Sequence, residues 1–504
     1  MNSKEGSLEN STIWSTTKTS LWFSSLHTLG TSVISIPLGL VSSILIARTL
    51  GPAGKGSYDL VLVTTTLLSM ILGFSIPSGI TYVVARGKAA LDLLFLKLIL
   101  TALLQGLLAV MLLYTLPYTG YSTLFLPPQT GNGIITAIVI SLVFSLLSGY
   151  WRAILIGLQQ ITLANKADLL SRVLQPVLLL AGIGILILLK HQPSPPIFIW
   201  INVAVIILTN LIFLRVLYPS SPPLLKLQER GKGGEGVGEV RSNKPTPESP
   251  SPSSPWRSLF YLSTRDTSGF GEILRYAFPC YLANLIQFLN YRLDVFIVSF
   301  FVGVKGVGLY TLAVSLAQLI WLISNAAATV LLPRVAALQD IVSENVTRTT
   351  QITRVSFWLS FISALFLALL ADQILPWVYG EAFRQSITPL LGLLPGIVAF
   401  SVVNVLASYI AGIGKPQLNL AVSSVGLVVT VIFDLWLIPR FDIFGAAIAS
   451  TFSYSISALL TLEIFTRKSK VPVRQVLLLT SEDIGGVILL LQKLVKRTSP
   501  QKEG

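Results

Sequence analysis

The stretch IITAIVISLVFSLLSGYWRAILI, residues 134–156, contains a single charged residue, Arg152. As a helix, a run this long and apolar can cross the roughly 30 Å hydrocarbon core of a membrane. Its apolar residues do not alternate with polar ones, as they would in a strand of a membrane β-barrel. We therefore expect a membrane-spanning helix, whose backbone satisfies its own hydrogen bonds in lipid.

Similar apolar runs recur along the whole 504-residue chain. Hydrophobic residues make up 53% of the sequence and charged residues only 12%, and the mean hydropathy is +0.75. A water-soluble fold could not hide this much apolar surface. The sequence predicts an all-α polytopic membrane protein of about twelve transmembrane helices, at 26–46, 58–84, 91–116, 134–156, 169–189, 197–216, 274–301, 309–332, 355–375, 387–413, 418–438 and 445–465.

The formal net charge of +14 comes from basic residues that lie mostly in short connections and tails. The connections after even-numbered spans are the basic ones, and Arg48 and Lys55 in the first outer connection are the exceptions. The positive-inside rule places basic connections in the cytoplasm, so both termini are expected on the cytoplasmic side. The membrane is expected to be the inner (plasma) membrane of a bacterium. Membrane lipids are therefore expected partners, and nucleic acid is not.

Residues 219–258 interrupt the apolar pattern with segments such as GKGGEGVGEV and KPTPESPSPSSP. Segments of this composition bury too little apolar surface to fold. The sequence thus predicts four parts: an N-terminal six-helix lobe (1–216), a largely disordered cytoplasmic linker (217–272), a C-terminal six-helix lobe (273–466) and a cytoplasmic tail (467–504). In the tail, apolar residues at helical spacing after Ser481 predict an amphipathic helix on the membrane surface.

The two halves resemble each other. LGPAGKGSY (residues 50–58) and VGVKGVGLY (302–310) align without gaps at an offset of 252, which pairs Gly51 with Gly303 and Gly56 with Gly308. Six spans in each half predict parallel repeats, related by an axis along the membrane normal, around a central cavity. The glycine-rich segment lacks the residue spacing of a nucleotide phosphate loop, so we expect a tight turn there.

Metal and enzyme chemistry have little support in the sequence. Its only cysteine is Cys280, and its only histidines are His27 and His191, which leaves no His-based metal cluster. We expect neither a metal nor a cofactor. The connections on the outer side are short, so no large extramembrane loop offers catalytic acids or bases, and we expect no enzymatic activity.

Polar residues form a stripe along the seventh predicted span. They recur at spacings of three and four, which places them on one helix face, and they are Asn284, Gln287, Asn290, Tyr291 and Asp294. Gln318 and Asn325 in the eighth span and Asn404 in the tenth extend the pattern. Such stripes either join helices through hydrogen bonds or contact a substrate, and the sequence leaves both readings open.

Arg292 and Asp294 place two ionisable groups inside this same span. Each costs roughly 2.5–3.5 kcal/mol on insertion scales, so each needs a partner or a wet cavity. Residues two apart point to different sides of a helix, so a simple intrahelical ion pair is not expected. We interpret Arg292 as a substrate contact and Asp294 as a group that couples transport to an ion, with Asp434 as a second candidate for coupling.

Four arginines cap spans at their expected cytoplasmic ends: Arg86, Arg152, Arg172 and Arg275. Arginines at such positions often only anchor helices among lipid headgroups. Alternatively, side chains from both lobes could ring a vestibule, where guanidinium groups bind phosphate oxygens in a two-pronged geometry.

Two stretches resemble the polysaccharide and oligosaccharide (O-unit) flippase branch of the multidrug/oligosaccharidyl-lipid/polysaccharide exporter superfamily. They are ILIARTLGPAGKGSYDLVLVTTTLLSMILGFSIPSGITYVVARG (residues 44–87) and YRLDVFIVSFFVGVKGVGLYTLAVSLAQLIWLISNAAATVLLPRVAAL (291–338). The resemblance implies twelve helices in two lobes, a cationic central cavity, and an Arg-x-Asp pattern that Arg292 and Asp294 match.

The resemblance also implies a function. A polyprenyl-pyrophosphate-linked glycan would move from the cytoplasmic to the periplasmic leaflet by alternating access, for the synthesis of exopolysaccharide or O-antigen. A polysaccharide polymerase or export machinery is a partner that the resemblance leaves open. The first span lacks the charged residue of the peptidoglycan-precursor branch and the acidic cation site of drug/sodium antiporters, and the linker is longer than the family pattern.

The sequence leaves two other functions open. A drug or metabolite cation antiporter would share the fold. Loss of such a protein would not cause lipid-linked sugar to accumulate inside the cell. A membrane polysaccharide polymerase would need a sizeable extramembrane loop with catalytic residues.

Overall fold

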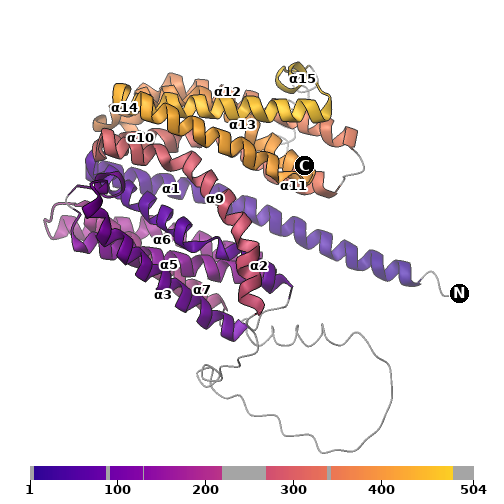
Figure 1. Cartoon of the computed structure of the whole chain (residues 1–504), viewed down its shortest axis with the longest axis horizontal. Coiled ribbons are helices and arrows are strands. Elements are labelled where there is room, and N and C mark those ends of the chain that lie inside the picture. Colours follow the sequence, from indigo (N-terminus) through magenta and orange to yellow (C-terminus); the bar gives the residue numbers. More distant parts are fainter. Residues whose placement is uncertain (1–4, 87–90, 129, 218–267, 338–341, 481–504) are drawn as a thin grey trace, which may run out of the picture. The chain divides into compact units, whose positions relative to one another are not determined.

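The computed structural model describes residues 5–86, 91–128, 130–217, 268–337 and 342–480, and these ranges contain helices and no strand. Figure 1 traces the helices along the chain. They are α1 (Glu5–Gly73), α2 (Ile76–Ala85), α3 (Leu91–Thr115), η1 (Leu116–Thr119), α4 (Ser122–Phe125), α5 (Asn132–Gly157), α6 (Ile161–Leu188), α7 (Pro195–Leu217), α9 (Ser268–Phe301), α10 (Val304–Gln318), α11 (Trp321–Ala337), α12 (Val342–Tyr379), η4 (Glu381–Ser386), α13 (Ile387–Gly412), α14 (Pro416–Ser469) and α15 (Val473–Leu477).

Within these ranges, eight helices are long and apolar enough to cross a membrane, and the bent pair α10–α11 makes a ninth. Two of these eight helices, α1 and α14, are too long for a single crossing of the membrane. α14 has 54 residues and would be about 80 Å long at 1.5 Å per residue. It breaks at Asp442, where φ is 51°, and α1 breaks at Gly51, where φ is 66°. Each therefore holds two of the predicted spans.

All twelve predicted spans fall on helices, and the all-α membrane fold is confirmed. Two spans are not continuous. The second is interrupted at Phe74 and Ser75, because Pro77 in the first turn of α2 cannot continue the preceding helix. The eighth is bent by 49° between α10 and α11. α9 has 34 residues but is not among the apolar helices, which agrees with its polar stripe.

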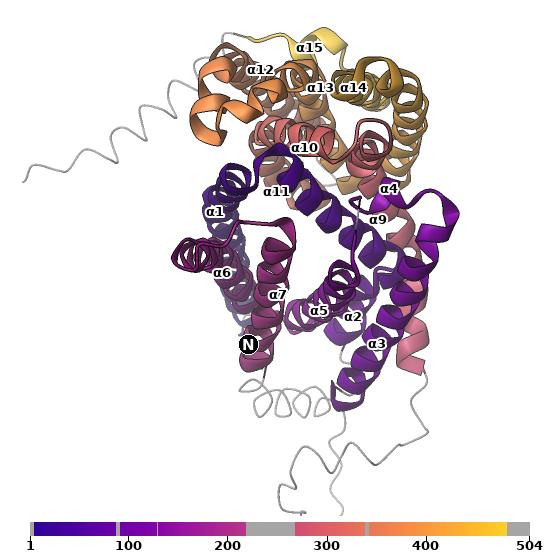
Figure 2. The same cartoon turned by 90° about the vertical axis from the view of Figure 1, so that its left-hand side faces the viewer.

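The chain folds into two compact units. The first draws its described residues from Met1–Thr49, Val61–Ser122 and Pro128–Leu285, and the second from Leu50–Leu60, Thr123–Pro127 and Ile286–Gly504. α9 contributes to both. In the second unit, α13 packs against α11, α12 and α14, and Figure 2 shows α12, α13 and α14 as neighbours.

The predicted repeat is visible in the backbone. Gly51 and Gly303 adopt the same conformation, with φ of 66° and 85° and an extended ψ, which only glycine takes readily. Within the second unit the two equivalent segments cross. A Cβ on Gly56 would lie 1.7 Å from the Val304 carbonyl oxygen, and one on Gly308 would lie 2.0 Å from that of Pro52. Both glycines are required because backbone meets backbone at this crossing.

A polar cluster lies beside the crossing. The Thr311 hydroxyl donates a hydrogen bond to Asp59, and these residues are 252 positions apart, the offset of the repeat. The ammonium of Lys55, only 4% exposed, also pairs with Asp59. Lys55 is therefore neutralised within its own helix. This pairing explains a basic residue on the side where few were expected.

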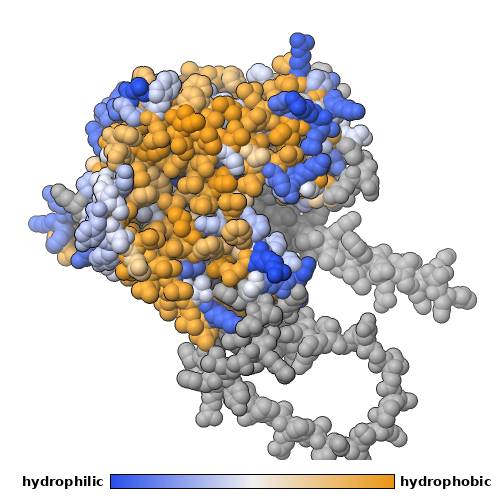
Figure 3. All heavy atoms as spheres, viewed as in Figure 1, coloured by the Kyte–Doolittle hydropathy of each residue, from blue (hydrophilic) through white to orange (hydrophobic). Residues whose placement is uncertain are grey.

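Large apolar side chains are exposed on the flanks of the helices. On α3 they include Leu100, Leu103, Leu104, Leu107 and Met111, and on α12 Phe361, Ile362, Leu365, Phe366 and Leu369. Figure 3 shows apolar residues over the sides of the helices and hydrophilic residues toward their ends. Water does not tolerate apolar flanks of this extent, whereas lipid does. The chain is a multi-pass membrane protein.

After α14, the short helix α15 packs on the second unit. The Arg354 guanidinium donates a hydrogen bond to the Gln475 carbonyl at 2.8 Å, and the Trp358 indole donates to that of Leu477 at 2.8 Å. Val476 is fully buried in the same contact. The predicted amphipathic helix after Ser481, and residues 218–267 of the predicted linker, lie outside the described residues.

Candidate functional site

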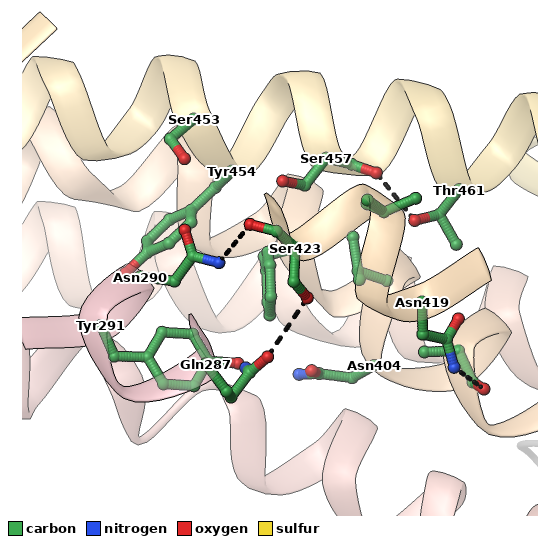
Figure 4. Close-up of a pocket in the computed structure, with 14 residues that line it drawn as sticks. Gln287, Asn290, Tyr291, Asn404, Asn419, Ser423, Ser453, Tyr454, Ser457 and Thr461 are labelled. Atoms are coloured by element: carbon green, nitrogen blue, oxygen red, sulfur yellow. Dashed lines mark hydrogen bonds between the residues drawn. The ribbon is translucent and has the colours of Figure 1, made fainter. Parts of the chain in front are cut away.

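Three helices of the second unit enclose a polar cavity of about 230 Å³ (Figure 4). α14 contributes from both sides of its break at Asp442, because its two segments fold back beside each other. The lining residues are Gln287, Asn290 and Tyr291 of α9, Phe400, Val403, Asn404 and Ala407 of α13, and Asn419, Val422, Ser423, Ser453, Tyr454, Ser457 and Thr461 of α14.

Hydrogen bonds hold these polar side chains in place. The Asn290 amide donates to the Ser423 carbonyl at 2.7 Å, and the Ser423 hydroxyl donates to Gln287 Oε1 at 3.3 Å, which ties α9 to α14 (Figure 4). The Asn404 amide donates to the Ser324 hydroxyl at 3.0 Å and so ties α13 to α11. The stripe on α9 therefore serves both readings of the sequence: it joins helices and it lines a cavity.

One wall of the cavity is aromatic. Tyr291, Phe400 and Tyr454 line it, and Trp321 packs behind them with its ring centroid 4.9 Å from Phe400 and 5.5 Å from both tyrosines. The indole of Trp321 donates a hydrogen bond to the Ile397 carbonyl at 2.9 Å. This bond and the ring contacts hold the wall in one arrangement.

Asp294 is buried one helical turn beyond Asn290 on α9, with 3% of its surface exposed. Three donors surround its carboxyl group: the Tyr310 hydroxyl, the Val295 backbone N–H at 2.8 Å and the Ser450 hydroxyl at 3.3 Å. Donors of this kind favour an ionised carboxylate.

Asp434 is fully buried on α14 and differs from Asp294 in its surroundings. Neither of its carboxyl oxygens has a hydrogen-bond partner within the part of the chain that the structure describes. It lies close enough to Asp294 for the two carboxyl groups to interact electrostatically. Burying an unpaired carboxylate costs several kcal/mol, so this position calls for a proton or a bound cation.

The carboxyl pair adjoins the polar cavity. Thr430, one turn before Asp434, donates a hydrogen bond to the cavity residue Ser453 at 2.8 Å. Ser450, which donates a hydrogen bond to Asp294, precedes Ser453 by three residues on the same helix. The cavity and the pair thus share α9 and both segments of α14.

The structure gathers some of the predicted site residues and separates others. Gln287, Asn290, Tyr291 and Asn404 line the cavity. Arg292 is half-buried, does not line it, and forms no salt bridge with Asp294 among the described residues. Gln318 is half-buried elsewhere, and Asn325 is exposed. Asn284 belongs to the first unit, where it donates a hydrogen bond to Ser75 at 3.1 Å.

The four predicted arginines all belong to the first unit and are exposed. Arg86 stacks on the Tyr82 ring at 4.3 Å, and Tyr82 stacks on Tyr276, the neighbour of Arg275. Arg152 pairs with Asp168 at 2.7 Å, one turn before Arg172. Arg86 is therefore held by an aromatic stack that includes the residue next to Arg275, and Arg152 is held by an aspartate on the helix that carries Arg172.

Sequence reasoning missed the contribution of α14. Its serine and threonine residues recur at helical spacing, at Ser450, Ser453, Ser457 and Thr461, in the way that the stripe on α9 does. That periodicity was available in the sequence. Asn419 and Ser423, in contrast, precede the break at Asp442 and only the fold brings them to the same cavity.

Comparisons with known proteins match both halves of the chain. Residues 257–499 match the family model of the lipid II flippase MurJ, and residues 22–221 match that of the polysaccharide biosynthesis proteins. The chain belongs to the multidrug/oligosaccharidyl-lipid/polysaccharide exporter superfamily. No curated protein matches the sequence.

Solved structures of this superfamily share the fold. The lipid II flippase MurJ in an inward closed conformation has 14% sequence identity and a TM-score of 0.65, over 94% of this chain and 93% of that one. An inward-facing multidrug resistance MATE transporter has 15% identity and a TM-score of 0.63, over 88% and 98%. A Vibrio cholerae MATE transporter has 14% identity and a TM-score of 0.54, over 90% and 97%.

Proposed function

We propose that the chain is a flippase of the bacterial inner membrane that moves a polyprenyl-pyrophosphate-linked oligosaccharide from the cytoplasmic to the periplasmic leaflet, for the synthesis of surface polysaccharide. It works by alternating access and catalyses no covalent step. Two features support a lipid-linked glycan: the matching family models describe a lipid II flippase and polysaccharide biosynthesis proteins, and the interior of the second unit is rich in amides and hydroxyls.

The observation that carries transport is the buried carboxyl pair, Asp294 and Asp434. An ionisable residue inside a membrane bundle is costly, so it marks an ion or proton path by default. Asp294 has three donors and Asp434 has none. A proton or cation at Asp434 relieves the repulsion between the two groups, and its release couples an ion gradient to the movement of the lobes.

The arginines act on the diphosphate in this proposal. It is attracted at the cytoplasmic side by Arg86, Arg152, Arg172 and Arg275, and Arg292 receives it deeper in the membrane. Guanidinium groups suit this task because they stay charged and bind phosphate oxygens in pairs. The lipid tail remains in the bilayer. A polysaccharide polymerase or export machinery on the periplasmic side would receive the flipped glycan.

A cation antiporter is the second candidate, since MATE transporters share the fold. The deciding experiment is mass spectrometry of lipid-linked intermediates in a strain that lacks the protein. A flippase predicts that polyprenyl-pyrophosphate glycan accumulates on the cytoplasmic side and that surface polysaccharide is lost. If lipid-linked glycan stays at the normal level while the cells become sensitive to organic cations, the antiporter is correct.

Complementation tests the role of the pair in the same strain. Asp434→Asn keeps the shape of the side chain and removes its titratable group. The variant should be folded and should fail to restore export, because the ion can no longer bind and leave. Full export by folded Asp434→Asn protein would exclude Asp434 from coupling.

A further inference from the structure

We propose that the cavity between α9, α13 and α14 binds one uncharged sugar ring of the translocated glycan. This inference rests on the proposed function and adds to it a subsite, a ligand class and a preference.

The lining carries no Lys, Arg, His, Asp or Glu side chain. An anion such as the diphosphate finds no positive group there, and an organic cation finds no carboxylate. Burying either charge without a partner would cost too much in this setting. The ligand of the cavity is therefore uncharged, and the diphosphate binds elsewhere.

Size limits the ligand further. The cavity of about 230 Å³ lies below the roughly 300–1,000 Å³ of pockets for drug-sized ligands. It offers room for a single six-membered ring with its hydroxyl groups, and not for an oligosaccharide. The remaining sugars of the glycan lie outside it.

Unused hydrogen-bonding groups face this space. Among the described residues, the hydroxyls of Tyr454 and Ser457 donate to no other group, and the amide oxygens of Asn404 and Asn419 accept no hydrogen bond. Hydroxyl groups of a sugar are both donors and acceptors and can satisfy all four. The Asn404 and Asn419 amides are already held by bonds to Ser324 and to the Ala407 carbonyl, so their oxygens are preorganised.

The aromatic wall completes the match. A sugar ring has an apolar face of C–H groups, which packs on the flat face of an aromatic side chain while the hydroxyls point to the polar wall. Tyr291, Phe400 and Tyr454 line the same cavity as the amides and serines of α13 and α14. Figure 4 shows Tyr291 and Tyr454 toward one end of it and Asn404 and Asn419 toward the other. A cavity lined by aromatic rings together with amides and hydroxyls suits a sugar better than water alone or a hydrocarbon.

Binding to the purified full-length protein in lipid nanodiscs tests the subsite directly. The probes are methyl glycosides of neutral hexoses and of an N-acetylhexosamine, with a methyl hexuronide as the acidic comparison. Binding is followed by saturation-transfer NMR and by tryptophan fluorescence. The contribution of Trp321 to the fluorescence is obtained by subtracting the signal of the Trp321→Phe variant from that of the wild type. Ligands this small are expected to bind with a Kd on the order of 1 mM. At least one neutral glycoside should bind, and the hexuronide should bind at least 10-fold more weakly.

Ala407→Phe should block the cavity, because the new ring enters the space between α13 and α14. The matched control is Ala421→Phe, which adds the same ring at an exposed position on α14. Glycoside binding should fall at least 10-fold in Ala407→Phe and stay unchanged in Ala421→Phe. If Ala407→Phe does not fold, Ser457→Ala deletes one unpaired hydroxyl and should weaken binding several-fold.

Three results would overturn the subsite: no neutral glycoside binds the wild-type protein, the hexuronide binds equally well, or folded Ala407→Phe binds as the wild type does. The level of lipid-linked glycan in the deletion strain distinguishes failure of the subsite from failure of the flippase proposal. If the strain accumulates lipid-linked glycan and folded Ala407→Phe restores normal export, the subsite is wrong and the flippase stands. If the strain accumulates none, the flippase is wrong whatever the glycosides do.

Discussion

Asp294 and Asp434 show how two identical side chains acquire different properties from their surroundings. Asp294 accepts hydrogen bonds from a tyrosine, a serine and a backbone N–H, whereas Asp434 has no such donor among the described residues. Donors stabilise an ionised carboxylate, and burial without donors favours the neutral form or a bound cation. The two carboxyl groups are therefore chemically different, which makes Asp434 the one that calls for a proton or a cation in the proposed coupling.

Arg292 provides the sharpest test at the scale of residues. If it meets the diphosphate, Arg292→Ala should lower glycan export about 10- to 100-fold, since a hydrogen bond to a charged group contributes roughly 1.5–3 kcal/mol. Arg292→Lys should recover only part of the activity, because an ammonium lacks the planar two-pronged contact. Asp294→Asn should slow turnover more than substrate capture. Export is measured per amount of folded protein.

The double variant Arg292→Ala with Asp294→Asn serves as the control for a structural role. Two groups that only balance each other's charge would lose protein level when changed singly and regain it when changed together. Recovery of export in the double variant would therefore remove Arg292 from the substrate path.

At the scale of elements, the crossing of the two repeat-related segments depends on small residues. Gly56 and Gly308 let the helix that follows Gly51 approach α10 until backbone touches backbone. The pairs Gly56–Gly308 and Asp59–Thr311 each join equivalent positions of the repeat. Small residues at helix crossings are a common device in membranes, where close packing replaces the hydrophobic effect.

Gly56→Ala should destabilise the second unit, because its Cβ would overlap the Val304 carbonyl and the helices would have to separate. Overpacking of this kind costs about 1–3 kcal/mol, and contact with rigid backbone places this case at the upper end. Gly184→Ala on α6 is the matched control, since nothing lies within 4 Å of its added Cβ. Thermal unfolding in detergent should show a lower Tm for Gly56→Ala only, and equal Tm values would contradict the crossing.

At the scale of the whole molecule, apolar flanks and polar interiors follow from the membrane as solvent. The sides of α3 and α12 expose leucine and phenylalanine, while amides and carboxyls lie inside the second unit. This arrangement differs from that of a soluble protein, and it places the polar cavity of the second unit away from lipid.

Topology is the prediction at this scale. We propose that both termini and the predicted linker are cytoplasmic, since the basic connections follow the even-numbered spans and Lys55, an exception to the trend, is paired with Asp59. A fusion of alkaline phosphatase within residues 219–258 should be inactive, and a fluorescent reporter at the same place should be bright. Phosphatase activity at that position would reverse the assigned orientation.

The sequence by itself determined the fold class, the number and position of the spans, the repeat and the polar stripe of α9. These properties are local or periodic: a span is set by its own apolar residues, and Gly51 and Gly303 reveal the repeat by alignment alone. The likeness of two segments also carried the superfamily, because it depends on the order of residues and not on their contacts.

Only the tertiary structure decided which polar residues meet. Asp434 and Asp294 are 140 positions apart, and Asn419 and Ser457 lie on opposite sides of the break in α14, so no spacing rule relates them. The structure also separated residues that the stripe had grouped: Gln287 lines the cavity, while Asn284, three residues earlier, packs in the other unit. Helical periodicity fixes the face on which a side chain lies, but the neighbouring helix decides what that face touches.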